Sequence, residues 1–329
     1  MQNRKSAALL WALSAFLLCL CGCAGRTEKR QLFAMDTVME LTVCGESSAL
    51  DAAEAEIYRL DGLLSAQNQS SEIARLNAGQ TAVSDETAKL VKRALELSRL
   101  TDGAFDPTLL PVSRAWGFFT GEYRVPDAEE LQSLLETTGW RRVLADGNTV
   151  TMPQGFALDL GGIGKGYAAQ RLRSLLSQAG VRSALLSLGG NVSVIGTKPD
   201  GSAWRVAVQH PDGGFLGTVE AADECVVTSG GYQRFFEKDG VRYHHILDPQ
   251  TGRPAESGLS SATVVSRDDT AADALSTALF VMGAEKAEEL WRRCGGFEMI
   301  LLTDDGRLLV TEGLRKKFIS ELPFEVIVR

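Results

Sequence analysis

A glycine-rich stretch near the middle of the chain, DLGGIGKGY at residues 159–167, limits the possible folds more than any other feature of the sequence. Its four glycines follow a short apolar run and precede apolar residues at helical spacing. A glycine turn at the N-terminus of a helix presents unpaired N–H groups to a phosphate, and Lys165 would add a positive charge. The spacing matches neither the P-loop pattern nor GxGxxG. On this pattern alone, an anion site and a tight turn needed for close packing are both open.

The size and charge of the chain narrow its class. Its 329 residues, 44% of them hydrophobic, suffice for one large domain or for two intimate lobes with a boundary near residue 140. The formal net charge is −8, so the sequence offers no basic surface for nucleic acid, and any anion site must be local. No CxxC or Cys/His cluster predicts zinc, and Cys44, Cys225 and Cys294 are expected to be small buried hydrophobes.

The N-terminal residues have the pattern of an export signal. MQNRK carries two positive charges and precedes the apolar run AALLWALSAFLLCL and the small residues CGCAG. LCGC at 20–23 also fits a bacterial lipobox, which predicts a signal peptide over 1–22, a lipid on Cys23 and a tether over 23–31. The alternative is a plain signal peptide with incidental cysteines. Each buried CH₂ of a lipid contributes about 0.8 kcal/mol to membrane binding, so lipid chains on Cys23 would hold the protein firmly. We therefore expect an exported protein anchored to a bacterial membrane, at the periplasmic face of the inner membrane or the cell surface.

Hydrophobic periodicity predicts an α+β protein with mostly antiparallel strands and inserted helices. Period-two runs predict strands over 32–44 and 156–160, a hairpin about Asp146-Gly147, and further short strands between 184 and 230. Residues 101–112, with two prolines, are expected to form a loop. Apolar residues at three- and four-residue spacing predict helices over 48–64, 85–100, 127–138 and 168–179, and in the segments DDTAADALSTALFVMG and AEKAEELWRRCGG.

The segment DALSTALF at 273–280 carries a possible cation site. Asp273 and Thr277 are four residues apart on a predicted helix, so their side chains emerge on one face. A carboxylate with a hydroxyl suits Mg²⁺, which one or two protein carboxylates hold while water and substrate phosphates complete its shell. An early-helix Asp and a mid-helix Thr are also ordinary, so this pair alone is a weak signal.

The segment YHHILDPQTGRP at 243–254 holds two of the three histidines, His244 and His245. Histidine is a natural base near neutral pH. Adjacent residues of a strand point to opposite faces, so at most one of the two is expected to enter a site. A hydrogen-bonded strand histidine before a turn is an equally open interpretation.

Three loop-like clusters each contain an aromatic or polar residue that could face a planar ligand. They are SSEIARLN (70–77), GAFDPT (103–108) and TSGGYQRFF (228–236). Asp106 before a proline and Ser229 before two glycines fit turn chemistry first and a site second. Ser229 does not lie in GxSxG, so the sequence gives no support for a hydrolase elbow.

The order of these motifs resembles the ApbE family of exported flavin transferases, the FAD:protein FMN transferases. The resemblance covers residues 32–329 and implies a two-lobed ApbE-like domain. It rests on eight segments in order: AMDT, SSEIARLN, TDGAFDPT, DLGGIGKGYA, SLGGN, TSGGYQRFF, HHILDPQTGRP and DALSTALF. In that light DLGGIGKGY is interpreted as one wall of a site for FAD and magnesium, with glycines that permit close backbone approach.

The resemblance implies a reaction and its partners. Family members bind FAD with Mg²⁺ and transfer the FMN part to a Thr or Ser hydroxyl of a target flavoprotein, releasing AMP. Some members hydrolyse FAD to FMN and AMP instead. Expected targets are membrane-bound electron-transfer subunits or exported flavoproteins with a short Thr/Ser motif.

The resemblance also implies roles for individual residues. Magnesium would be held by Asp273 and Thr277 with the backbone carbonyl of Gly162, assisted by Ser276. The proton acceptor for the attacking hydroxyl is predicted to be His245, with Asp273 or bound phosphate as rivals. The FAD-contacting set predicted for this chain is Met35, Gln67, Ala104, Phe105, Asp106, Asp159, Lys165, Ser229 and Leu247.

Three positions depart from the family pattern. Gly162 can contribute only its backbone carbonyl to a metal, at a position where relatives can carry Thr. Gln67 stands where many members carry an aromatic residue, so a stacking contact with one ring of FAD is absent or supplied elsewhere. Asp36 follows Met35 where glycine is common. Two alternative functions stay open: an FAD pyrophosphatase using the same site, and a lipoprotein that stores or delivers flavin without chemistry. Lys165, Asp273 and Thr277 together favour chemistry, because storage does not require a metal at the pyrophosphate.

Overall fold

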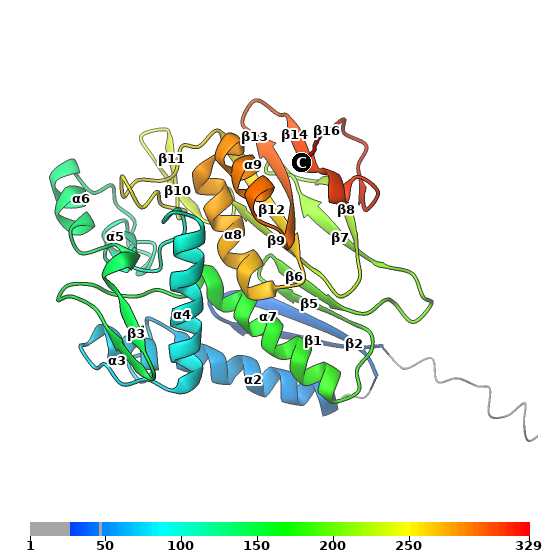
Figure 1. The fold of residues 1–329 in the computed structure, drawn as a ribbon, viewed down its shortest axis with the longest axis horizontal. Helices are drawn as coiled ribbons and strands as arrows, with labels where there is room; N and C mark the ends of the chain where they lie inside the picture. Colours follow the sequence, from blue (N-terminus) through cyan, green and yellow to red (C-terminus); the bar gives the residue numbers. More distant parts are fainter. Residues whose placement is uncertain (1–26, 46–47) are drawn as a thin grey trace, which may run out of the picture.

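The computed structural model describes residues 27–45 and 48–329, and its centre is a nine-stranded sheet (Figure 1). In spatial order the strands are β1 (Thr27–Ala34), β2 (Thr37–Cys44), β5 (Ala184–Leu188), β6 (Asn191–Ile195), β9 (Cys225–Gly230), β12 (Leu259–Ser266), β13 (Phe297–Thr303), β14 (Leu308–Thr311) and β16 (Glu325–Ile327). Neighbours are antiparallel except β14 and β16. β12 and β13 are almost entirely buried, because layers cover both of their faces.

A helical layer packs on one face of this sheet and encloses the main apolar core (Figure 1). Its helices are α2 (Ser48–Leu64), α4 (Asp85–Leu100), α7 (Gly161–Gln178), α8 (Asp269–Met282) and α9 (Ala284–Arg293). α8 is buried along nearly its whole length, between the sheet and the helices α7 and α4. Its sequence is accordingly apolar on most sides, and its alanines allow α7 to approach closely.

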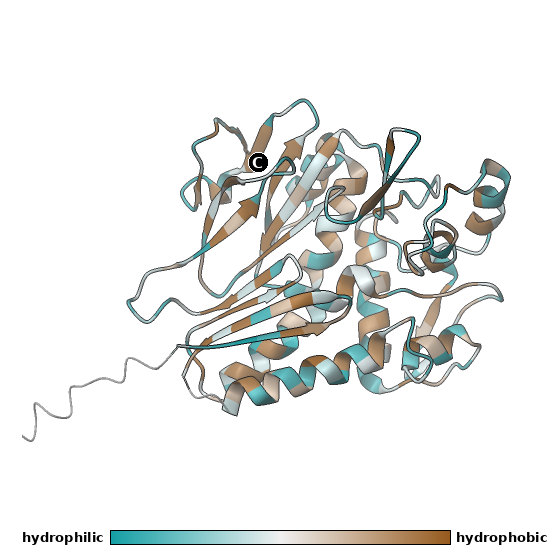
Figure 2. Ribbon diagram, turned by 180° about the vertical axis from the view of Figure 1, so that it is seen from behind, coloured by the Kyte–Doolittle hydropathy of each residue, from teal (hydrophilic) through white to brown (hydrophobic). Residues whose placement is uncertain are grey.

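The opposite face of the sheet is covered by a three-stranded sheet in the order β15 (Phe318–Ile319), β8 (Phe215–Ala221) and β7 (Trp204–Gln209). Mostly aliphatic residues of both sheets form a second core, which includes Val194, Val265 and Ile300 from the large sheet. The strands of both sheets alternate apolar and polar residues where one face meets solvent, as the hydropathy colouring of Figure 2 shows.

A third core is rich in aromatic residues and lies beside the helical layer. It is built from α5 (Leu110–Ala115), α6 (Ala128–Leu135) and the hairpin of β10 (Phe235–Lys238) and β11 (Val241–His244). Trp116 and Phe236 both lie against Tyr243, and their ring centroids are 5.3 and 5.2 Å, respectively, from that of Tyr243. The remaining short elements are α3 (Glu72–Asn77), β3 (Leu144–Asp146), β4 (Thr149–Thr151) and 3₁₀ turns at Trp140–Arg142 and Glu312–Leu314.

These layers confirm the predicted α+β class with mostly antiparallel strands. The lobe boundary near residue 140 stays a prediction. The predicted signal peptide and the lipidation site Cys23 lie outside the described residues, whereas residues 27–31, assigned above to the tether, begin β1. Within the described part of the chain, no helix is long and apolar enough to cross a membrane.

Several predicted elements are wrong in their bounds. The strand predicted over 32–44 is instead the hairpin of β1 and β2, because Met35 and Asp36 take positive φ angles of 49° and 58° and reverse the chain. The strand predicted over 156–160 does not form. The side-chain amide of Asn77 pairs with the backbone of Leu158 there, at 2.8 and 2.9 Å, in place of a neighbouring strand.

Three helices also differ from the prediction. The helix predicted over 127–138 is the shorter α6, which ends at Leu135. Residues 101–112 were expected to be a loop, yet the chain enters α5 at Leu110, with a proline in its first turn. α7 begins at Gly161, so the glycines lie in its first turns rather than before it. The helices α2 and α4 match the predicted ranges, and the Ser84 hydroxyl caps α4 by accepting from the Thr87 amide.

Candidate active site

A cavity of about 630 Å³ opens where the start of α7, the middle of α8 and the aromatic core meet. Its size suits a ligand larger than a single sugar or base. It brings together most of the residues predicted from the sequence. Those that line it are Met35, Gln67, Ala104, Phe105, Asp106, Asp159, Gly162, Lys165, His245, Leu247, Asp273 and Thr277.

One side of the cavity, which we call the helical wall, consists of Asp159, Gly162, Lys165, Asp273 and Thr277. Its geometry follows from the close contact of α7 with α8. The Gly166 amide donates to Oδ2 of Asp273 over 2.8 Å. A Cβ at position 166 would lie 2.3 Å from the Asp269 carbonyl oxygen and 2.7 Å from Cβ of Asp273. Glycine is therefore required at 166 for packing, and the same packing places a carboxylate at the cavity.

Charges alternate along the helical wall. Nζ of Lys165 lies 3.9 Å from Oδ1 of Asp273 and 3.3 Å from the Gly161 carbonyl oxygen. Asp159 precedes α7, and its Oδ1 accepts from the Gly161 amide over 2.8 Å. Burial raises the pKa of Asp159, while the Gly161 amide and the Lys165 charge act in the opposite direction. The wall thus combines two carboxylates, one ammonium group and the N-terminal end of a helix dipole.

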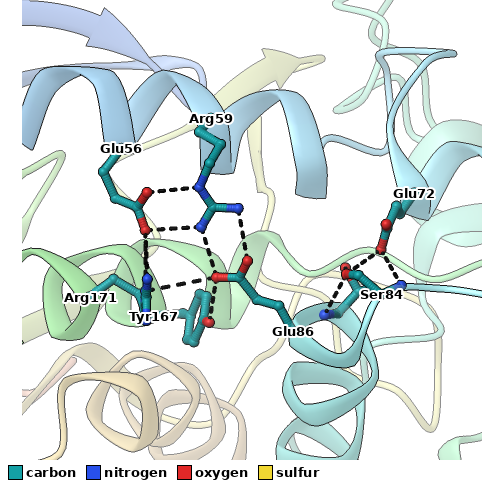
Figure 3. Close-up of polar contacts among 8 residues, drawn as sticks. Glu56, Arg59, Glu72, Ser84, Glu86, Tyr167 and Arg171 are labelled. Atoms are coloured by element: carbon teal, nitrogen blue, oxygen red, sulfur yellow. Dashed lines mark hydrogen bonds and ion pairs between the residues drawn. The ribbon is translucent and has the colours of Figure 1, made fainter. Parts of the chain in front are cut away.

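The start of α7 is also held from its far side by a charged network (Figure 3). The Tyr167 hydroxyl donates to Oε1 of Glu86 over 2.8 Å, and Arg59 donates to both Glu86 and Glu56. Arg171 completes the network with Nη2 3.1 Å from Glu56. The hydrogen bond from Arg59 is the main cause of a lowered pKa at Glu86. The network joins α2, α4 and α7, so it fixes the helix that carries Lys165.

The opposite side, which we call the aromatic wall, consists of Phe118, Phe119, Arg234, His245 and Leu247. The backbone amide and Nδ1 of His245 both lie 3.1 Å from the Arg234 carbonyl oxygen. A carbonyl only accepts, so Nδ1 carries the hydrogen and Nε2 keeps its lone pair. Burial lowers the pKa of His245 to about 4, and the charges of Arg234 and Lys165 act in the same direction. His245 is therefore neutral at pH 7.

His244 turns away from the cavity, as expected for a neighbour in the chain. Its Nε2 lies 3.2 Å from the Ala255 carbonyl oxygen, and its ring meets Phe280 edge-on. Only one of the two histidines enters the site, in agreement with the prediction.

Asp106 lines the cavity, but both oxygens of its carboxylate accept hydrogen bonds from the protein itself. Oδ1 accepts from the amide and hydroxyl of Thr108 over 2.8 and 2.6 Å, and Oδ2 accepts from the Trp140 amide over 3.1 Å. Burial raises the pKa of Asp106 against these hydrogen bonds. The loop sets the neighbouring Phe105 ring against Gly162, where a Cβ would lie 3.1 Å from the ring.

Ser229 and Ser276 are not among the residues that line the cavity. They lie behind Thr277: Oγ of Ser229 is 2.8 Å from Oγ of Ser276 and 3.3 Å from Oγ1 of Thr277. The direct contact with FAD predicted for Ser229 stays a prediction.

Sequence reasoning missed several lining residues. Arg234 lies in the cluster TSGGYQRFF but is absent from the predicted site, and its guanidinium donates to the Phe118 carbonyl. Phe119 also lines the cavity without having been predicted. Its carbonyl accepts from Nε2 of Gln67 over 3.1 Å, and the Arg114 guanidinium lies 4.7 Å from its ring centroid. An arginine among glycines and aromatic residues was the one signal available, because nothing in the sequence brings 119 beside 67.

The fold and the cavity define a class: an α+β protein in which a carboxylate and a hydroxyl from one helix lie beside a lysine at the start of another helix, facing a neutral histidine on an aromatic wall. The sequence model of the ApbE family matches residues 35–301, and the chain belongs to that family. The resemblance identified from the motifs is thereby confirmed.

Relatives and solved structures agree along most of the chain. A protein named FAD:protein FMN transferase from Treponema pallidum is 34% identical, covering 94% of this chain and 96% of that protein. One of the same name from Vibrio cholerae is 33% identical and covers 93% and 98%. An ApbE protein from Thermotoga maritima superimposes with a TM-score of 0.84 at 33% identity, covering 89% and 99%. The apo flavinyl transferase ApbE of Pseudomonas stutzeri gives 0.79 at 32%, covering 90% and 98%.

Proposed function

We propose that this protein transfers the FMN part of FAD to a Thr or Ser hydroxyl of a target flavoprotein and releases AMP. The hydroxyl oxygen forms a new bond to the phosphorus on the FMN side. The bond from that phosphorus to the bridging oxygen breaks, and AMP leaves with the bridging oxygen. The names of the relatives support flavin transfer.

One observation carries the proposal: Asp273, Thr277 and Lys165 lie together on one wall of the cavity. The Gly166 amide and the packing of α7 on α8 hold this arrangement. A protein that only stores flavin does not need these three residues together, whereas phosphoryl transfer needs positive charge and positioned oxygens at the phosphates. Lys165 would bind the diphosphate directly and Asp159 would orient the start of α7 through the Gly161 amide.

The residues fit a single Mg²⁺. Within residues 27–45 and 48–329, no group of three or more His, Cys, Asp or Glu side chains is arranged to hold a metal alone. One carboxylate and one hydroxyl are a donor set that Mg²⁺ accepts when substrate phosphates and water complete its shell. When bound, the ion would offset negative charge on the diphosphate.

Gly162 would contribute through its carbonyl. In a regular helix the Gly166 amide pairs with the carbonyl four residues earlier. Here Asp273 accepts from that amide, so the Gly162 carbonyl at most shares it and keeps lone-pair density for a cation. Ser276 would assist from behind, because its hydroxyl donates to the Asp273 carbonyl over 2.8 Å.

His245 would accept the proton of the attacking hydroxyl. Its Nε2 is the free ring nitrogen, and the low pKa keeps the ring neutral at physiological pH. The aromatic wall beside it offers apolar surface for the flavin or adenine ring, with Leu247 and Phe118 among its residues.

The decisive experiment incubates the full chain in detergent with FAD, Mg²⁺ and a domain that carries a candidate flavinylation motif. The mass of the domain and the release of AMP are followed together. A matched domain with the acceptor Thr replaced by Val is the control. The expected result is one FMN added per intact domain with equal AMP, and none on the Val control.

Other outcomes separate the alternatives. Equal amounts of free FMN and AMP without a modified domain would favour an FAD pyrophosphatase. Bound FAD without AMP would overturn the enzymatic proposal and leave a flavin carrier.

We further propose that the protein is exported and anchored to a bacterial membrane through a lipid on Cys23, facing membrane-bound electron-transfer subunits as targets. The N-terminal sequence supports this proposal. Mass spectrometry of the N-terminal peptide from membranes tests it. An unmodified Cys23, or a peptide beginning elsewhere, would count against lipidation.

A further inference from the structure

We propose that Ser229 is a positioning residue that turns the Thr277 hydroxyl so that its lone pairs, rather than its hydrogen, face the cavity. This inference rests on the proposed function, because it concerns an oxygen that would ligate Mg²⁺. It replaces the direct contact between Ser229 and FAD with an action through Thr277.

The hydroxyls involved form a short chain behind the helical wall. Ser229 lies near the end of β9, where pairing with Ala262 of β12 fixes its backbone. Ser276 and Thr277 are consecutive residues of α8. Ser276 is fully buried, and Ser229 lies behind the cavity rather than in its lining. The chain therefore reaches the cavity only at Thr277.

The direction of the hydrogen bonds in this chain follows from counting donors. The Ser276 hydroxyl donates to the Asp273 carbonyl over 2.8 Å, and a carbonyl can only accept. Ser276 has a single hydrogen, so its 2.8 Å contact with Ser229 requires Ser229 to donate. The single hydrogen of the Ser229 hydroxyl is therefore used in its bond to Ser276. Its 3.3 Å contact with Thr277 requires Thr277 to donate.

This ordering has a chemical consequence at the cavity. Oγ1 of Thr277 makes no second hydrogen bond within the described residues, so its lone pairs stay available. A hydroxyl ligates a cation through a lone pair, and an inward hydrogen would repel the ion. The Asp273 carbonyl fixes the direction of the Ser276 hydroxyl, which in turn fixes that of Ser229. Ser229 then fixes the direction of the Thr277 hydroxyl. Loss of a residue that hydrogen-bonds to a metal ligand commonly changes metal affinity by about 10–100-fold.

The test measures Mn²⁺ affinity rather than activity alone. The full chain in detergent is titrated with Mn²⁺ in the presence of FAD, and free Mn²⁺ is followed by its electron paramagnetic resonance signal. We expect Ser229→Ala to raise the Kd for Mn²⁺ about tenfold. Its Kd for FAD without metal should stay within twofold of the unmodified chain, because Ser229 does not touch the ligand.

Two further variants keep the test decisive. Ser229→Thr retains a hydroxyl and should restore most of the Mn²⁺ affinity. Ser276→Ala frees the hydrogen of Ser229 to point at Thr277, so it should also weaken Mn²⁺ binding while Ser229 stays intact. Ser276→Ala carries the test alone if Ser229→Ala does not fold, which circular dichroism reports.

The outcomes distinguish this inference from the proposed function. Unchanged Mn²⁺ affinity in Ser229→Ala overturns the inference and leaves the function intact. If Ser229→Ala does not fold, unchanged Mn²⁺ affinity in a folded Ser276→Ala has the same meaning. Loss of metal-free FAD binding in Ser229→Ala also overturns it, in favour of direct contact. An unmodified chain that binds no Mn²⁺ and releases no AMP from FAD overturns both proposals.

Discussion

The two walls of the cavity are built differently, although they face the same space. In the helical wall, Asp273 is 4% exposed and Gly166 has no room for a methyl group, so the charged groups are set by helix packing. The aromatic wall is formed by loops and the base of a hairpin, held by hydrogen bonds to the backbone oxygens of Phe118, Phe119 and Arg234. Such loop contacts open at lower cost than packed helices. The charged groups of the helical wall are thus positioned by close helix packing, whereas His245 and the rings of the aromatic wall are positioned by hydrogen bonds between loops.

The largest effect is expected from Asp273→Asn in the helical wall. An Asn oxygen can still accept from the Gly166 amide, so the fold should survive while the negative charge is lost. We expect the transfer rate with saturating FAD to fall about 1000-fold. Quantifying AMP release measures it. A rate within tenfold of the unmodified protein would show that the helical wall does not carry the chemistry.

Gly166→Ala tests whether packing sets the helical wall. The added Cβ meets the Asp269 carbonyl, so we expect a loss of about 3 kcal/mol in the free energy of unfolding, measured by chemical denaturation. Gly164→Ala is the matched control, because a Cβ there has no neighbour within 4 Å. It should leave stability unchanged or raise it by about 1 kcal/mol. Equal effects at both positions would refute the packing argument.

His245→Asn tests the aromatic wall. It should lower the transfer rate about 100-fold and leave metal-free FAD affinity nearly unchanged. In the unmodified protein, kcat/KM should stay level above pH 5 and fall below the pKa of about 4, where the ring becomes charged. The pH profile of AMP release checks both, and a full rate in the variant would exclude His245 as the proton acceptor.

The same histidine has a consequence for stability with a definite sign. Its folded pKa of about 4 lies below its unfolded value, so the unfolded chain binds more protons between the two. Its contribution should be complete above about pH 6.5 and should diminish as the pH falls toward 4. Denaturation at several pH values should show a smaller dependence in His245→Asn.

The smallest effect is expected from Gln67→Ala, which removes one exposed hydrogen bond to the Phe119 carbonyl. Stability should change by less than about 0.5 kcal/mol. FAD affinity should fall about threefold if the loop contact orders the aromatic wall. Gln69, exposed in the same loop, is the matched control, and fluorescence titration measures both. An equal loss of FAD affinity in Gln67→Ala and Gln69→Ala would show that the contact with the Phe119 carbonyl does not order the aromatic wall.

Much of the site was predictable because its residues lie in local patterns. Asp273 and Thr277 share one helix face, and the two histidines are neighbours in the chain, so their directions followed from helix and strand geometry. Arg234 and Phe119 were not predictable in this way. Their place at the cavity depends on a hairpin and a loop that approach from distant parts of the chain.

The sequence by itself determined the antiparallel α+β class, the helices α2 and α4, the Ser84 cap of α4, and the family. These depend on hydrophobic period, capping residues and motif order. Only the tertiary structure decided that the glycines of DLGGIGKGY lie inside α7 and that residues 156–160 pair with Asn77 rather than with a strand. Local patterns do not encode those outcomes, because each depends on a partner from elsewhere in the chain: the Asp269 carbonyl in one case and a side-chain amide in the other.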